Sequence, residues 1–132
     1  MTIQYIDLND PGDGHTYSSA TVAGDYIFTS HIGGFLDEEG KVLEGTAVQT
    51  ARCFENLSEI LSAAGASLDD VVKVMVYLKD MRDFEDMRDV YRVIFKRGFP
   101  ARMTATTRFV DPRCRIQIEA IAYKPRGYQD AK

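Results

Sequence analysis

One arginine stands out as a candidate for binding chemistry. Arg102 directly follows the segment Gly98-Phe99-Pro100-Ala101, so a proline and the start of an expected strand both restrict its backbone. Its guanidinium offers a planar fork of donors that matches a carboxylate, and it keeps its charge at every working pH. An arginine at the start of a strand is more often a surface or ion-pair residue. The residue type alone therefore leaves two interpretations, a carboxylate anchor and a surface charge.

The other residues with chemical potential are few and scattered. His15 and His31 are the only histidines, and neither has metal-ligand spacing from Cys53 or Cys114. We therefore expect no metal site. Cys53 lies beside an apolar helical stripe and is interpreted as a packing residue. Cys114, at a junction between loop and strand, is a weak candidate for a reactive thiol.

The bulk properties of the chain narrow the class of protein. Its 132 residues predict a single domain over 1–132, and 45% hydrophobic residues suffice for an ordinary core. A formal net charge of −4 argues against nucleic acid as a main partner, because phosphate backbones are bound by basic surfaces. Two separated cysteines without a secretory segment predict a cytoplasmic protein. No stretch is apolar for long enough to predict a membrane span.

Strands and two helices are expected to position these residues. Alternation and turn signals predict strands at 3–8, 16–22, 26–30, 71–79, 102–109 and 115–123. The second and third of these are expected to form a hairpin through Ala23-Gly24-Asp25. Spacings of three and four predict helices over 46–64 and 83–97. For the first helix, Thr46 is the expected N-cap, Gln49 is in the capping-box position, and Gly65 is the stop.

This order, β-β-β-α-β-α-β-β, predicts an α+β fold in which two helices cover one face of a mixed sheet. The uncovered face would carry Tyr77, Arg102, Thr104, Thr106, Arg108, Gln117 and Glu119, together with Val71, Met75 and Val110. This mixture is too polar for a core. It is explained either by burial against other subunits around a partly wet interior or by exposure to solvent.

A family likeness extends from about Tyr17 to Tyr123. It is carried by Phe28-Thr29-Ser30, 49–52, 55–57, 61–74, 77–81, Asp83-Phe84, Tyr91, Phe95, Pro100-Ala101-Arg102 and 118–122. The stretch around Gly65 and the Pro-Ala-Arg triplet are its most specific parts. In these segments the chain resembles the Rid family, the reactive-intermediate (enamine/imine) deaminases formerly called YjgF.

The resemblance implies a chorismate-mutase-like fold and a homotrimer with ligand clefts between neighbouring subunits. It implies that Arg102 binds the carboxylate of a small metabolite and that Tyr17 closes the cleft. Backbone groups near Ser30 and Thr104 would hold the nitrogen and a water molecule. The implied reaction is hydrolysis of a 2-imino acid, or its enamine tautomer, to a 2-keto acid and ammonia. Such imines react with water unaided, so the site need only orient and polarise, without cofactor or metal.

Three positions depart from the family pattern. Gln117 stands where typical deaminases have the glutamate that handles the proton of the water, and an amide can orient water but cannot take its proton. His31 lies in the cleft segment, and histidine is a side chain suited to proton transfer, so it is either a substitute proton carrier or a half-exposed strand-end residue. Arg88 replaces a usual asparagine, either as a second positive charge in the cleft or as a surface residue.

Three functions follow from these observations. The first is an imine/enamine deaminase acting on small amino-acid-derived intermediates. The second is a non-catalytic carboxylate-binding trimer, a metabolite sensor or partner protein, that retained Arg102 and lost the glutamate. The third is an endoribonuclease or translation inhibitor, against which the acidic balance and the absence of a histidine pair both argue.

Overall fold

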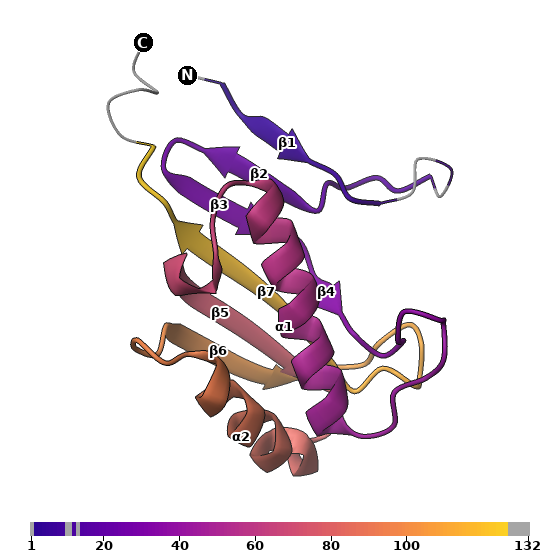
Figure 1. Ribbon diagram of the computed structural model, residues 1–132. Helices are drawn as coiled ribbons and strands as arrows, with labels where there is room; N and C mark the ends of the chain where they lie inside the picture. Colours follow the sequence, from indigo (N-terminus) through magenta and orange to yellow (C-terminus); the bar gives the residue numbers. More distant parts are fainter. Residues whose placement is uncertain (1, 10–11, 13, 127–132) are drawn as a thin grey trace.

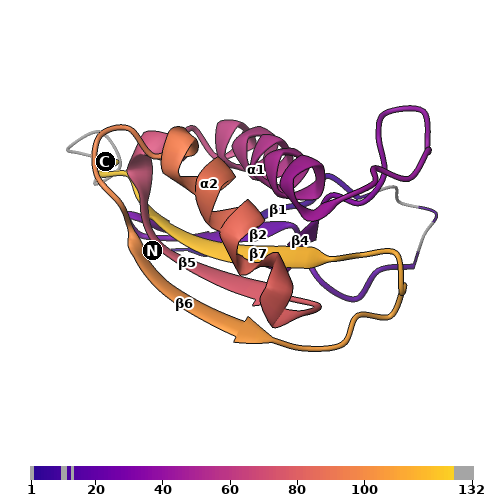
Figure 2. The ribbon, with the colours of Figure 1, turned by 90° about the horizontal axis from the view of Figure 1, so that it is seen from below.

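The computed structural model describes residues 2–9, 12 and 14–126. These residues form a seven-stranded sheet with two α-helices on one of its faces (Figures 1 and 2). The strands are β1 (Gln4–Ile6), β2 (Ala20–Ala23), β3 (Tyr26–Thr29), β4 (Ile32–Gly33), β5 (Val71–Leu78), β6 (Ala101–Thr106) and β7 (Ile116–Tyr123). The helices are α1 (Thr46–Ala63) and α2 (Phe84–Ile94), with short 3₁₀ turns at η2 (Leu68–Asp70) and η3 (Met81–Asp83).

The strand order confirms the predicted mixed sheet with two helices on one face. Its order is β1-β2-β3-β7-β5-β6, and β4 also pairs with β7. Only β5 and β6 pair in parallel, because α2 carries the chain back between them. The β2–β3 hairpin is present, with Gly24 at φ 61° in its turn. The short strand β4 is one strand more than the sequence predicts.

The core lies between the sheet and the two helices. Phe54, Leu57 and Leu61 of α1 are buried against the inward side chains of β5 and β7. Met87, Tyr91 and Phe95 extend this core beneath α2, and the rings of Phe54, Tyr91 and Phe95 contact one another. The predicted inward positions of the last strand, Ile116, Ile118, Ala120 and Ala122, are all buried. Cys53 is fully buried and packs in the core, as expected.

The start of α1 differs from the expected capping box. Gly45 is the N-cap, with φ 105°, and Thr46 is already helical. The Gln49 amide instead donates to the carbonyls of Leu43 and Arg113 at 2.9 and 3.0 Å and accepts from the Arg115 N–H at 2.8 Å. The Gln49 side chain therefore binds backbone groups distant in the sequence instead of capping its own helix. The stop at Gly65 is confirmed, with φ 79° just beyond the C-cap.

The second helix and the strand after it are shorter than predicted. α2 ends at Ile94 rather than at 97, because Phe95 takes an extended conformation that buries its ring against Phe54. β6 ends at Thr106 rather than at 109, where the parallel pairing with β5 also ends.

Two segments face the opposite way from the prediction. A register shift between Val71 and Lys73 turns Val71 into the core and leaves Val72 exposed. On β6, Arg102, Thr104 and Thr106 pair with Val74, Val76 and Leu78, all of which are buried on the helix side. Residues paired across two strands share a face, so the assignment of these three β6 residues to the uncovered face was wrong. Tyr77, Gln117, Glu119 and Met75 do lie there, on the face opposite the buried Val76 and Ile118.

Candidate functional site

Arg102 lies against α2 in a hollow of about 370 Å³. Its guanidinium carbon is 4.9 Å from the ring centroid of Tyr91 and 5.6 Å from that of Phe84. Stacking on two rings fixes the orientation of the guanidinium while leaving its edge N–H groups free to bind an anion. The hollow is lined by Arg88, Tyr91, Arg92, Phe99, Pro100 and Arg102, and we call it the Arg102 pocket.

Arg88 joins Arg102 in this pocket. It is half-buried, and its guanidinium carbon lies 5.9 Å from the centroid of the same Phe84 ring. Arg92, one helical turn further on, lines the pocket as well. Of the residues on α2, only Arg88 was expected at the site; Tyr91 was named only among the residues of the family likeness, and Arg92 was missed. Their spacing of three and four residues from Arg88 is the signal that could have found them.

The buried hydroxyl of Tyr91 is a further polar group of the pocket. Its residue is only 2% exposed, and among the described residues no group accepts from it or donates to it with good geometry. Burial raises the pKa of Tyr91, while Arg102 acts in the opposite direction through its positive charge and through a side-chain contact with the hydroxyl that lacks hydrogen-bond geometry. The hydroxyl therefore stays protonated at neutral pH and can donate a hydrogen bond to a bound anion.

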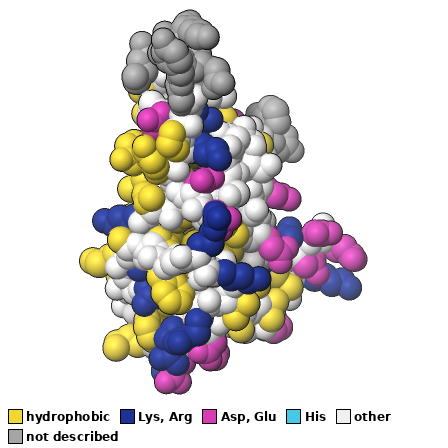
Figure 3. Space-filling view, turned by 60° about the vertical axis from the view of Figure 1, so that its left-hand side comes forward, with side chains coloured by type: hydrophobic (Ala, Val, Ile, Leu, Met, Phe, Trp, Pro, Cys, Tyr) yellow, Lys and Arg dark blue, Asp and Glu magenta, His cyan; other side chains and the backbone are white. Residues whose placement is uncertain are grey.

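Thr104 lies two residues along β6 from Arg102 and lines a second hollow of about 370 Å³ together with Phe84 and Met81. The Phe84 ring borders this hollow and also packs beneath Arg102. The structure thus brings Arg102, Arg88 and Thr104 together along one edge of the molecule. On the face shown in Figure 3, Lys and Arg side chains gather with hydrophobic ones at the height of α2 and β6.

A second group of predicted residues lies at the interruption between β3 and β4. Both strands pair with β7, and Ser30 and His31 form the break between them. Ser30 donates its N–H to the Ser19 carbonyl at 3.0 Å. The rings of Tyr17 and His31 are 5.1 Å apart, and both residues are exposed. The break therefore holds an exposed aromatic and a titratable group beside each other.

The ring of His15 also contacts Tyr17, with the centroids 5.1 Å apart. Both histidines of the chain therefore flank one tyrosine, although no histidine pair was expected from the sequence. The pairing could not be read from the sequence, because residues 15 and 31 meet only through the β2–β3 hairpin between them.

Gln117 lies on the uncovered face of the sheet. Its partners on the neighbouring strands are Gly33 of β4 and Tyr77 of β5. His31 precedes Gly33 by two residues, so Gln117 lies near the break between β3 and β4. Tyr77 donates to the Glu119 carboxylate at 2.8 Å, and this hydrogen bond raises the pKa of Tyr77. Tyr77 thus binds Glu119, which lies two residues along β7 from Gln117, the position of the family glutamate.

The residues around Arg102 and the residues around Gln117 and the β3–β4 break do not meet within one chain. Arg102 points to the helix side of the sheet, whereas Gln117 lies on the other side. Strands β7 and β5 separate β4 from β6, and at about 4.8 Å per strand this spacing is roughly 14 Å. A site that uses both groups at once requires two copies of the chain.

The surroundings of Cys114 do not favour a reactive thiol. It is buried, donates to the Ile116 carbonyl at 3.3 Å, and its pKa is raised by burial above all. A thiol with a raised pKa is a poor nucleophile at neutral pH. Cys53 has a raised pKa for the same reason.

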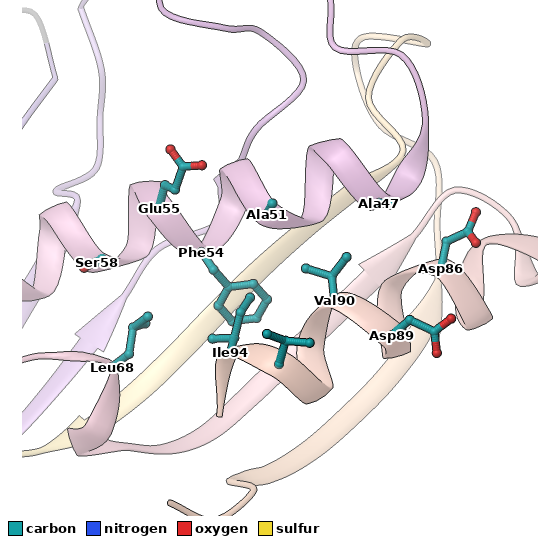
Figure 4. A pocket seen from close by; sticks show the side chains of 11 residues that line it. Ala47, Ala51, Phe54, Glu55, Ser58, Leu68, Asp86, Asp89, Val90 and Ile94 are labelled. Atoms are coloured by element: carbon teal, nitrogen blue, oxygen red, sulfur yellow. The ribbon is translucent and has the colours of Figure 1, made fainter. Parts of the chain in front are cut away.

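A larger hollow of about 720 Å³ lies between α1 and α2 (Figure 4). Its floor is apolar, formed by Ala47, Ala51, Phe54, Val90 and Ile94, and carboxylates stand at its rim. None of the predicted site residues lines it. Ala47 and Ala51, expected to pack in the core stripe, are only half-buried because they border this groove.

Neither a metal cluster nor a membrane segment is found in the part of the chain that the structure describes. Within residues 2–9, 12 and 14–126, no three His, Cys, Asp or Glu side chains are grouped to hold an ion. No helix of this part is long and apolar enough to cross a membrane.

Comparisons with known proteins agree with this architecture. The family model described as "Endoribonuclease L-PSP" matches residues 8–124. A RutC family protein of Pyrococcus abyssi is 43% identical over 109 residues, which is 82% of this chain and 86% of that protein. The 2-iminobutanoate/2-iminopropanoate deaminase of Homo sapiens is 34% identical over 85% of this chain and 82% of its own length. The crystal structure of the YjgF gene product from E. coli superposes with a TM-score of 0.80 at 30% identity, covering 91% of this chain and 98% of that one.

Proposed function

Because the chain belongs to the Rid (YjgF, endoribonuclease L-PSP) family, we propose that it hydrolyses small 2-imino acids to 2-keto acids and ammonia. The observation that carries the proposal is the stacked guanidinium of Arg102, which is held over Tyr91 and Phe84 with its donor edge open. A guanidinium fixed in this way can hold the carboxylate of an imino acid in two parallel hydrogen bonds.

The cleft would be completed by a second subunit in a homotrimer. Arg102 and Thr104 of one chain would face Tyr17, Ser30 and His31 of its neighbour, since a single chain keeps these groups apart. The neighbour's Gln117 would orient the water that attacks the C=N carbon, with His31 nearby as the titratable group. Water adds to the carbon, the C–N bond breaks, and the nitrogen leaves as ammonia.

The activity is tested by generating 2-iminobutanoate with a dehydratase and trapping the remaining imine chemically. We expect the wild type to remove the imine faster than buffer does. Arg102→Ala should lower kcat/KM about a hundredfold, the size expected for losing a bidentate charge-assisted contact. Arg82→Ala is the matched control, because Arg82 is an exposed arginine outside the pocket. A wild type no faster than buffer contradicts the deaminase proposal for this substrate.

The amide at Gln117 favours one alternative, a trimer that binds small carboxylates without turning them over. An amide cannot take the proton of an attacking water. This alternative predicts binding of a carboxylate ligand that Arg102→Ala abolishes, without acceleration of hydrolysis. If Gln117→Glu then creates or raises the activity tenfold or more, the missing carboxylate is the reason.

The two histidines that flank Tyr17 favour a second alternative, ribonuclease activity, because a histidine pair can supply both an acid and a base. This alternative requires that RNA cleavage co-elutes with the pure protein and falls in His31→Ala. Cleavage that separates from the protein on a sizing column, or that His31→Ala leaves unchanged, removes it.

A further inference from the structure

The Arg102 pocket contains more positive charge than one carboxylate needs. Arg88, Arg92 and Arg102 all line it, and its other lining residues are Tyr91, Phe99 and Pro100. No Asp or Glu is among these residues. A concave site lined by several guanidinium groups and no acid favours a ligand with more than one negative charge.

The charges of α2 are separated onto two faces. Asp86 and Asp89 border the apolar groove toward α1 (Figure 4), whereas Arg88 and Arg92 line the pocket toward β6. Arg88 and Arg92 are four residues apart, a spacing at which like charges repel on a helix. The nearest counter-charge to Arg88 is Asp89, at 3.6 Å, and this acid is mostly exposed. The helix therefore keeps a repulsive pair of cations beside Arg102 without a strong internal partner.

Two buried polar atoms of this region have no hydrogen-bond partner among the described residues. They are the Tyr91 hydroxyl and Nε of Arg88. Buried polar groups in folded proteins are nearly always paired, so unpaired donors in a pocket indicate a ligand that accepts from them. Both atoms can donate, which again indicates an anionic ligand.

The Phe84 ring holds the guanidinium groups of Arg102 and Arg88 near each other. The Arg102 and Arg88 carbons lie 5.6 and 5.9 Å from its centroid. We propose that this pocket selects 2-imino acids that carry a second carboxylate, with Arg102 binding the carboxylate next to the imine and Arg88 and Arg92 binding the distal one. The proposal rests on the deaminase function above and names its substrate class, the four- and five-carbon 2-imino dicarboxylates.

Hydrolysis of a 2-imino dicarboxylate is balanced in atoms and electrons. One water adds to the C=N carbon, the C–N bond breaks, and a 2-keto dicarboxylate and ammonia leave. Neither carboxylate changes, and no carbon is oxidised or reduced, so no further reactant is required. The second carboxylate contributes only binding and orientation.

The test compares 2-iminosuccinate with 2-iminobutanoate, which have the same four carbons and differ by one carboxylate. Both are made in place by oxidising the amino acid enzymatically, and the remaining imine is trapped with semicarbazide. We expect kcat/KM of the wild type to be at least tenfold higher for 2-iminosuccinate. Arg88→Gln and Arg92→Gln should each reduce this ratio severalfold or more, whereas Arg82→Gln, at an exposed site paired with Asp80, should keep it. An equal kcat/KM for the two imines, or a ratio that Arg88→Gln does not change, overturns the proposal and leaves the deaminase function standing.

Binding of succinate and butanoate separates this inference from the activity itself. Both ligands are stable, so their dissociation constants can be followed by amide shifts in the NMR spectrum even if neither imine is hydrolysed. We expect succinate to bind at least tenfold more tightly and Tyr91→Phe to weaken this binding without lowering the Tm, since the hydroxyl makes no hydrogen bond to any other described residue. Equal affinities, or a Tyr91→Phe variant that binds succinate as the wild type does, count against the proposal.

Discussion

Gln49 shows how one polar side chain can be placed in a core. It is 1% exposed, and its amide makes three hydrogen bonds to backbone groups that belong to no helix or strand ladder. Next to it, Arg115 forms a bidentate pair with the buried Asp83 at 2.8 and 3.0 Å and reaches the Thr46 hydroxyl at 3.2 Å. Together these contacts tie the starts of α1, α2 and β7 to one another.

Gln49→Met keeps the length of the side chain and removes every one of these hydrogen bonds. Two carbonyls and one N–H would then be buried without partners, so we expect the free energy of unfolding to fall by about 2–4 kcal/mol. Urea denaturation measures this change through the transition midpoint. A loss below roughly 0.5 kcal/mol would show that water replaces the amide at no cost. Glu55→Met, at an exposed position on the same helix, is the control.

Two half-buried aspartates link stability to acid pH. The Arg82 side chain lowers the pKa of Asp80 to about 2, and the Arg113 side chain lowers that of Asp111 to about 2, from an ordinary value of 3.8. A depressed folded-state pKa contributes stability that is present above pH 3.8 and is lost as the pH falls toward 2. We expect Asp80→Asn combined with Asp111→Asn to flatten the pH dependence of unfolding in this window.

Carbon-detected NMR titration of the two carboxyl groups checks the cause directly. Arg82→Gln should return the pKa of Asp80 toward 3.8 without affecting Asp111, and Arg113→Gln should do the reverse. If both carboxyls titrate near 3.8 in the wild type, the ion pairs do not form in solution.

At the scale of elements, β4 and α1 meet through a glycine. A Cβ on Gly34 would lie 2.6 Å from the backbone nitrogen of Cys53 and 2.9 Å from the carbonyl carbon of Arg52. The helix backbone cannot retreat at this point, because Asn56 of α1 also donates to the Gly33 carbonyl at 2.8 Å. This close approach positions the break that carries Ser30 and His31.

Gly34→Ala should therefore lower the free energy of unfolding by about 2–4 kcal/mol through overpacking. Gly33→Ala is its matched control, because a Cβ there meets only the Gln117 side chain, at 3.8 Å. We expect that control to cost less than about 1 kcal/mol. Thermal unfolding of both variants gives the comparison, and equal Tm values for the two would contradict the contact.

The sequence predicted most elements because their signals are local. The β2–β3 hairpin, the stop at Gly65 and the alternation of β7 each depend on residues within a few positions of one another. It failed where distant segments decide. The parallel register with β5 decides which β6 side chains point to the helices. The orientation of Val71 is decided by a bulge that no residue pattern near it indicates.

The candidate site, too, was predicted only in part. The family likeness identified Arg102, Tyr17, Ser30 and Gln117, but not which of them lie together. Arg92 and the Tyr91 hydroxyl enter the pocket only through the packing of α2 beside β6. Whether Arg88 was a surface residue or a second cation depended on that same packing.

At the scale of the whole molecule, the uncovered face of the sheet is notable for its aromatic side chains. Tyr26 contacts both Phe28 and Tyr123 there, and all three are more than 40% exposed. Such a patch on an otherwise polar face is typical of an interface between subunits. It supports the interpretation that this face is buried in an oligomer.

Light scattering should accordingly give a mass of about 44 kDa, three times the 14.8 kDa of one chain. Phe28→Lys should lower this mass toward that of the monomer, because it places a charge in the buried patch. Val93→Lys, at a more exposed apolar residue on the helix side, should leave it unchanged. A wild type that is monomeric would leave the aromatic patch without a role.

The separation of Arg102 from Tyr17 within one chain has a genetic consequence. If a cleft takes its arginine from one subunit and its tyrosine from the next, two defective alleles can rescue each other. Trimers mixed at random from Arg102→Ala chains and chains impaired at Tyr17 would regain roughly a quarter of their clefts. Each parent protein alone would stay inactive, so recovery after unfolding and refolding the two together would reveal which residues share a cleft.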